Sequence, residues 1–208
     1  MYQQAIRYVN YLSQHTRPEL VYTVNQLAQF SAKPNVNHWN ALKHLFRYIE
    51  GTPDWGIHYQ SRIKSDESKP VLEGWDDSDY ANCSIDHKSI SGNIVMVFGN
   101  PISWLSKRQT IIAQSTTEAK FLSINICRLI TISKQATLNP QTKHIEVRYQ
   151  YLRQLVPNNT LEVRQVSTND MIVDVLTKPL SIEKLDELLP QMNLVSQEGV
   201  LKLDQGLI

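Results

Sequence analysis

The sequence has little net charge, few cysteines and no long apolar run. Its formal net charge of +1 neither indicates nor excludes a nucleic-acid partner, because charge can be concentrated on one face. Cys83 and Cys127 lack the spacing of a metal site, and two cysteines in a chain of this length indicate free thiols in a reducing compartment. No apolar run approaches the roughly 18 residues of a membrane span, and no secretion leader is recognisable. We therefore expect an intracellular protein of the cytoplasm or nucleus, with no membrane association.

The sequence does contain enough apolar residues for a folded core. They make up 41% of the 208 residues, which argues against wholesale disorder. A chain of this length forms one large domain or two small ones. Residues 61–70 are polar, so we place a linker there. It separates a domain at 1–60 from a second domain at 71–190, and we expect a weakly ordered tail at 191–208.

The first domain has apolar residues at helical spacing in three stretches. One stretch begins the chain. A second follows Thr16-Arg-Pro-Glu19, in which a threonine and a glutamate three residues later have the pattern of a capping box. The third runs from about Asn37 to Gly51, and five of its residues are expected to face inward: Trp39, Leu42, Leu45, Phe46 and Ile49. A short strand is predicted from Trp55 to Tyr59.

The second domain has the pattern of strands followed by helices. Alternation and turn residues predict an antiparallel meander of three short strands, at 71–80, 90–98 and 102–107. Helical spacing predicts helices at 115–130, at 142–155, from Asn169 and at 182–189. A further strand is expected at 161–166. Together these elements predict a mixed α+β (α/β) layer fold.

Three acidic residues stand at the starts or ends of different predicted elements. Asp77 ends the first strand. Glu118 lies in the first turn of the helix that begins at Ser115, and Asp174 lies near the start of a later helix. Carboxylates that a fold brings together are suitable ligands for a hard cation such as Mg²⁺. Each also has a purely structural explanation, as a turn residue (Asp77), as a capping-box partner (Glu118) or as an acid favoured by the helix dipole (Asp174).

Several motifs along the chain, taken together, resemble successive signatures of one protein family. They are Gly74-Trp-Asp-Asp-Ser-Asp-Tyr-Ala81, Asp86-His-Lys-Ser-Ile-Ser-Gly92, Pro101-Ile-Ser-Trp-Leu-Ser-Lys-Arg-Gln109, Ser115-Thr-Thr-Glu-Ala-Lys-Phe121, Thr142-Lys-His-Ile-Glu-Val147 and Asp174-Val-Leu-Thr-Lys-Pro-Leu180. In this order they resemble the ribonuclease H domain of copia-type LTR-retrotransposon polyproteins. Residues 1–60 resemble the segment that connects reverse transcriptase to ribonuclease H. The chain is therefore similar to a C-terminal fragment of such a Pol polyprotein.

This resemblance implies a fold and a chemistry. The fold is a five-stranded mixed sheet flanked by helices. The chemistry is cleavage of the RNA strand of an RNA–DNA hybrid, in which two Mg²⁺ ions activate a water and stabilise the leaving oxygen. Carried over residue by residue, Asp77 is the central first-strand ligand, Glu118 the first-helix ligand and Asp174 the last acid. The resemblance thus implies Asp77, Glu118 and Asp174 as catalytic and metal-binding residues.

The chain also departs from the family pattern. The family has a fourth strand with a further ligand in a Cys-Asp-Asn motif, whereas residues 129–140, which occupy that interval, contain no Asp or Glu. An internal deletion of this strand would remove a carboxylate that two mutually repelling cations share, so we expect hybrid cleavage to be absent or residual. Glu118 and Asp174 could retain weak affinity for a single metal ion. Four other positions have changed: Asp76 stands in place of Ser, His87 of Arg, Asn93 of Tyr and Lys120 of Glu.

Three functions remain open on this basis. An active nuclease would need a substitute carboxylate, for which the candidates are Asp76, Asp79 and Asp86. A nucleic-acid-binding remnant without catalysis would use the basic candidates Lys107, Arg108, Lys120 and Lys143. A decayed transposon reading frame without a selected role would explain the lost strand, the missing polymerase motif and the altered signatures together, and we favour it. The sequence does not indicate an oligomeric state.

Overall fold

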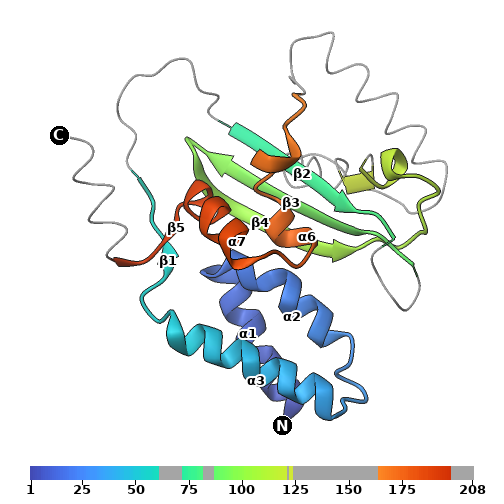
Figure 1. Cartoon of the computed structure of the whole chain (residues 1–208), viewed down its shortest axis with the longest axis vertical. Helices are drawn as coiled ribbons and strands as arrows, with labels where there is room; N and C mark the ends of the chain where they lie inside the picture. Colours follow the sequence, from blue (N-terminus) through green and yellow to red (C-terminus); the bar gives the residue numbers. More distant parts are fainter. Residues whose placement is uncertain (61–71, 82–86, 121, 124–163, 198–208) are drawn as a thin grey trace, which may run out of the picture.

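The computed structural model describes residues 1–60, 72–81, 87–120, 122–123 and 164–197. These residues form a unit of three helices, an antiparallel three-stranded sheet, short helices packed on the sheet and a two-stranded ribbon (Figure 1). The predicted mixed α+β class is confirmed. The linker at 61–70, the helix expected at 142–155 and the interval 129–140 lie outside the described residues.

The first unit consists of α1 (Tyr2–His15), α2 (Val21–Ala28) and α3 (Val36–Gly51), with the 3₁₀ turn η1 (Pro18–Leu20) before α2. The three predicted helices are thus confirmed. Their apolar stripes meet in a small core made of Tyr2, Ile6, Val9, Leu20, Val24, Leu27, Leu42 and Leu45. Phe46, which we expected to face inward, is 40% exposed, because α3 turns the stripe of Leu42 and Leu45 towards the other helices.

The helix ends differ from the prediction in one place. The capping box expected at Thr16 and Glu19 does not form, because Thr16 Oγ1 donates back to Leu12 O at 3.4 Å and Glu19 pairs with Arg17. A capping box does begin α3. There His38 N donates to Asn35 Oδ1 at 3.0 Å, and Asn35 N donates to His38 Nδ1 at 3.2 Å.

The sheet has the order β2–β3–β4 and is antiparallel throughout, which confirms the predicted meander. Its strands are β2 (Leu72–Asp79), β3 (Ile90–Val97) and β4 (Asn100–Arg108). The central strand β3 is buried along nearly its whole length, as its apolar run predicts. Asp76 pairs with Asn93 and Asp77 with Gly92, so the two neighbouring aspartates face opposite sides of the sheet.

The last described segment, 164–197, returns to the sheet (Figure 1). Its elements are η2 (Thr168–Asp170), α6 (Asp174–Thr177), α7 (Ile182–Leu188), η3 (Pro190–Met192) and β5 (Leu194–Val195). β5 pairs antiparallel with β1 (Gly56–Ile57). The expectation of a weakly ordered tail is therefore wrong for residues 191–197. Met192 and Leu194 are fully buried, because Asn193 adopts a left-handed conformation that turns the chain towards β1.

One larger core joins the helical unit to the sheet. It contains Val21 of α2, Ile94 of β3 and Leu176 of α6, together with side chains from α7 and β5. The indole Nε1 of Trp104 on β4 also donates a 2.7 Å hydrogen bond to Ser13 O in α1. The two parts of the chain therefore pack directly against each other. None of the helices within the described ranges combines the length and the apolar composition that a membrane crossing requires.

Candidate functional site

Asp77 and Asp174 are brought together by close packing between α6 and the sheet. Gly92 lies opposite Asp77 in the register of β2 and β3. A Cβ at Gly92 would lie 2.6 Å from Thr177 Cγ2 and 2.7 Å from Val173 Cγ1, so α6 can sit this close only on a glycine. Because Asp174 is the first residue of α6, this contact places both acids around one pocket.

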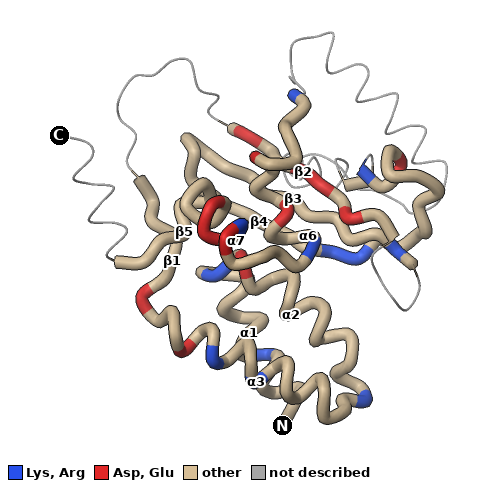
Figure 2. The backbone as a smooth tube through the Cα atoms, in the orientation of Figure 1, with Lys and Arg blue, Asp and Glu red and all other residues tan. Residues whose placement is uncertain are grey.

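The pocket has a volume of about 140 Å³. Asp77 and Asp174 are largely buried within it, with 7% and 4% of their surfaces exposed. The hydroxyl of Thr177 donates towards Asp77 Oδ2 at 3.5 Å. The remaining lining residues come from β2, from the helical turn at 116–120 and from the chain around α6: Ser78, Asp79, Lys120, Val166, Thr168, Met171 and Lys178. Figure 2 shows the acidic positions on β2 and basic positions beside α6.

Each of the two buried carboxylates has an ammonium group close to it. Lys178 Nζ lies 2.8 Å from Asp174 Oδ2, and Lys120 Nζ lies 3.6 Å from Asp77 Oδ1. The lysines differ in exposure, since the side chain of Lys178 is 31% exposed and that of Lys120 is 60% exposed. The pair with Asp174 is therefore the better shielded from solvent, and the pair with Asp77 is the more strongly screened.

The pKa of Asp174 is raised above its ordinary value of 3.8. Burial is the largest cause, because a desolvated carboxylate is less stable in its charged form. The hydrogen bond and charge of Lys178 lower the pKa, whereas the negative charge of Asp77 and a hydrogen bond between the two acids raise it. The two carboxylates thus repel each other when both are ionised.

Glu118 makes hydrogen bonds that cap the start of its own helix. Its backbone N donates to Ser115 Oγ at 3.1 Å, and its carboxylate accepts a 2.6 Å hydrogen bond from Gln114 N. Glu118 is half-buried and is not one of the described residues that line the pocket. The structure therefore brings together Asp77 and Asp174 but turns Glu118 to the start of its helix. Lys120, two residues further on, faces the pocket instead.

The direction of this helical turn is fixed by a second contact. Ser123 is fully buried, and its Oγ donates to Asp77 O at 2.8 Å. On the other face of β2, the Nδ2 of Asn93 donates to Asp76 Oδ1 and to Ser123 O, so the changed residues Asp76 and Asn93 belong to the same polar network. Ser115 at one end and Ser123 at the other thus hold Lys120 over Asp77.

The described residues do not fit the Mg²⁺ centre that the resemblance implies. Within the described ranges, no group of three or more His, Cys, Asp or Glu side chains is close enough to hold a metal ion. Two Mg²⁺ ions need several carboxylates to offset their mutual repulsion. Here Asp77 and Asp174 are accompanied by the ammonium groups of Lys120 and Lys178.

Sequence reasoning missed both lysines as part of this site. The pairing of Lys178 with Asp174 could have been predicted from the sequence, because the two residues have the i,i+4 spacing of a helical ion pair. Lys120 was noted as a replacement of glutamate, and its proximity to Asp77 gives that replacement a structural meaning. Gly92 ends one of the family motifs, but its packing role was not indicated, because that role depends on the approach of α6 from a distant part of the chain.

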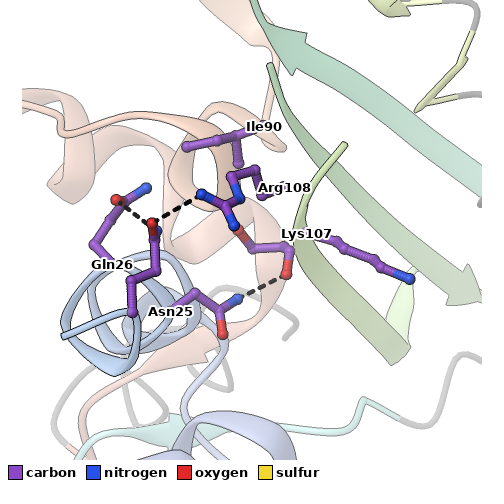
Figure 3. Close-up of a pocket in the computed structure, with 7 residues that line it drawn as sticks. Asn25, Gln26, Ile90, Lys107 and Arg108 are labelled. Atoms are coloured by element: carbon purple, nitrogen blue, oxygen red, sulfur yellow. Dashed lines mark hydrogen bonds between the residues drawn. The ribbon is translucent and has the colours of Figure 1, made fainter. Parts of the chain in front are cut away.

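A second pocket, of about 290 Å³, lies between α2 and the end of β4 (Figure 3). Asn25 Nδ2 donates to Ser106 O at 2.7 Å across it, and Arg108 Nη1 donates to Gln29 Oε1 at 3.4 Å. The side chain of Lys107 points away from α2 in Figure 3. The lining of this pocket contains amide side chains and the predicted basic residue Arg108, which contacts the helical unit through Gln29.

Three retrotransposon polyproteins align with most of this chain. The retrovirus-related Pol polyproteins from transposons RE2 and RE1 of Arabidopsis thaliana are 35% and 33% identical to it over 195 residues, and each alignment covers 80% of this chain and 13% of the relative. The retrovirus-related Pol polyprotein from transposon TNT 1-94 of Nicotiana tabacum is 30% identical over an alignment 213 residues long, gaps included, which takes in 89% of this chain and 16% of the relative. No family model and no solved structure matches the chain.

The chain spans between 13% and 16% of the length of these relatives. The alignment with the RE2 polyprotein runs over 195 residues while taking in 80% of 208, so this chain lacks residues that the relative has within the aligned region. Identity and coverage lead to one conclusion: the chain is homologous to a segment of copia-type retrotransposon Pol polyproteins.

Proposed function

We propose that this chain is a remnant of the reverse transcriptase and ribonuclease H region of a retrotransposon polyprotein, and that it does not cleave RNA–DNA hybrids. Its ancestral activity is then two-metal hydrolysis of the RNA strand. The observation that carries the proposal is the composition of the Asp77–Asp174 pocket. Two lysines accompany these acids, and the third candidate ligand, Glu118, is engaged at the start of its own helix.

Three further features support this proposal. The motif for the fourth-strand ligand is absent from residues 129–140. The alignments with the polyproteins include positions that this chain lacks. Lys120 stands where the resemblance implies a glutamate, and it places a positive charge next to Asp77 that a cation would meet there.

The test is cleavage of an RNA–DNA hybrid labelled on its RNA strand, in Mg²⁺ and separately in Mn²⁺. We expect the chain to release no more product than its Asp77→Asn variant, while an active ribonuclease H cleaves the same substrate. Cleavage by the chain that disappears in Asp77→Asn would show the proposal to be wrong. The Asp77→Asn variant also controls for contaminating nuclease, because both proteins are prepared in the same way.

A second candidate function is nucleic-acid binding without catalysis, which the α2–β4 pocket favours. Arg108 is positioned there by Gln29, and Lys107 stands beside it on β4. Contacts of this kind to phosphates release counterions and make binding weaker at higher salt. If the pocket binds a nucleic acid, Arg108→Gln will flatten the dependence of log Kd on log salt by about one unit per lost phosphate contact. Lys33→Gln, at an exposed lysine between α2 and α3, is the matched control.

A further inference from the structure

We propose that Lys120 and Lys178 act as the built-in counter-ions of the Asp77–Asp174 pocket and exclude divalent cations from it, and that Lys120 is the residue that decides this exclusion. The inference deepens the proposed function, since it explains the lost hydrolysis through cation binding. Its readout is binding of a metal ion, which can be measured without any cleavage.

Lys178 already occupies the open coordination side of Asp174 Oδ2 as a hydrogen-bond donor. Lys178 Nζ lies 2.8 Å from Asp174 Oδ2, at the distance of a charge-assisted hydrogen bond. Lys178 is the C-cap residue of the short helix that begins with Asp174, so the docking of α6 on the sheet places both residues beside the pocket. A divalent cation that bound Asp174 through this oxygen would have to displace the ammonium group.

Lys120 holds the corresponding place beside Asp77. The Nζ of Lys120 lies 3.6 Å from Asp77 Oδ1, on the open side of the pocket, and its side chain is 60% exposed. An exposed ion pair contributes little to stability. Its positive charge nevertheless stands where a cation would have to coordinate Asp77, and repulsion between like charges acts on an incoming ion whether or not the pair stabilises the fold.

A different side chain at position 120 would change the charge beside Asp77. Ser115 and Ser123 fix the helical turn on either side of this position, and Ser123 bonds directly to the backbone of Asp77. A glutamate at 120 would therefore start from the same backbone position. Its shorter reach is compatible with a bridging ion, because each metal–oxygen bond adds about 2.0–2.1 Å. Lys120→Gln lowers the local charge by one and Lys120→Glu by two, so the affinity for a divalent cation should rise in that order.

The experiment is a titration of the full chain with Mn²⁺, followed by the water-proton relaxation of bound and free ion. We expect no saturable binding by the unchanged chain below millimolar Mn²⁺, and at least tenfold tighter binding by Lys120→Glu, with Lys120→Gln between them. Adding Asp77→Asn to Lys120→Glu should abolish the gain. Lys33→Glu makes the same change of charge at a distant exposed lysine and should bind like the unchanged chain.

Two outcomes would overturn the inference. One is submillimolar binding by the unchanged chain that Asp77→Asn removes. The other is a folded Lys120→Glu variant, with the thermal unfolding profile of the unchanged chain, that gains no affinity. A variant that loses that profile is replaced by Lys120→Gln, for which an unchanged affinity is equally decisive. If the unchanged chain binds Mn²⁺ but cleaves no hybrid, this inference fails while the proposed function stands; if it cleaves the hybrid, the proposed function fails.

Discussion

Two ion pairs in this protein have similar distances and different surroundings. Arg17 and Glu19 meet at 2.6 Å, with side chains 5% and 3% exposed. The guanidinium of Arg17 also donates to Thr52 O and Thr52 Oγ1, at 2.9 and 2.7 Å, and lies over the ring of Tyr48. Lys178 and Asp174 meet at 2.8 Å, but the lysine side chain is 31% exposed and its partner faces a second carboxylate.

The difference shows what separates a structural ion pair from a candidate binding site. The donors of Arg17 are used within the protein, where they tie η1 to the end of α3, so this pair offers nothing to a ligand. The Asp77–Asp174 pocket is lined by residues that reach solvent, and one of its cations can move away from its partner. Residue types alone do not distinguish the two cases, because both are acids beside bases. The two cases are distinguished by solvent access and by the number of hydrogen-bond donors already engaged within the protein.

Arg17→Met is expected to have the largest effect on stability. It leaves the Glu19 carboxylate buried without its partner, which costs about 3–5 kcal/mol in the free energy of unfolding at pH 7. Burial already raises the pKa of Glu19 above 4.5, with Arg17 opposing the rise. A buried acid whose pKa is raised in the folded state destabilises the folded protein as the pH rises above the ordinary pKa of that acid. The loss of unfolding free energy caused by Arg17→Met should therefore shrink as the pH is lowered towards 4.5. Urea unfolding at several pH values measures this.

The control for this prediction is the double variant Arg17→Met/Glu19→Met, which removes both charges. We expect it to recover most of the lost stability at pH 7, because no charge remains buried. A double variant as unstable as Arg17→Met would mean that the contacts of the guanidinium with Thr52 and Tyr48, rather than the exposed charge of Glu19, account for the effect.

Gly92→Ala tests whether the close approach of α6 depends on glycine. A Cβ would meet Thr177 Cγ2 at 2.6 Å and Val173 Cγ1 at 2.7 Å, so we expect a loss of about 1–3 kcal/mol from overpacking. In a strand, alanine is otherwise the more favourable residue, so the sign of the change is informative. Gly56→Ala is the matched control, because a Cβ there meets nothing within 4 Å. Equal stabilities of the two variants, measured by chemical denaturation, would contradict the packing argument.

Much of the local structure could be predicted from the sequence. Helical spacing found α1, α2 and α3, and the alternation and turns of 71–107 found the antiparallel meander. The strand β1 was also expected, but its pairing with β5 was not. That pairing joins residues 56–57 to residues 194–195, and two-residue strands have no periodic pattern to recognise.

The candidate site could be predicted in part. Asp77 and Asp174 were identified because acids at the end of a strand and the start of a helix can converge, and they do line one pocket. The choice between positions 118 and 120 could not be made. Residues two apart on a helix point about 200° apart, so the side that faces the sheet is set by docking. Here that docking depends on Ser123 and its bond to Asp77 O, a contact between distant parts of the chain.

Lys178→Met should have the smallest of the three effects on stability, about 1 kcal/mol at pH 7, because the charged hydrogen bond it removes is partly exposed. The pKa of Asp174 is already raised by burial, and loss of Lys178 removes the main influence that lowers it. The stability loss caused by Lys178→Met should therefore shrink as the pH falls towards 3.8. This is the same direction as for Arg17→Met, but the loss at pH 7 is smaller. Lys43→Met, at an exposed position of α3, controls for the loss of a lysine and should change stability by less than about 0.5 kcal/mol. If Lys178→Met is equally silent at every pH, then the carboxylates tolerate each other without this counter-ion. The pocket would then resemble a solvent-accessible acidic site more than it resembles the buried ion pair of Arg17 and Glu19.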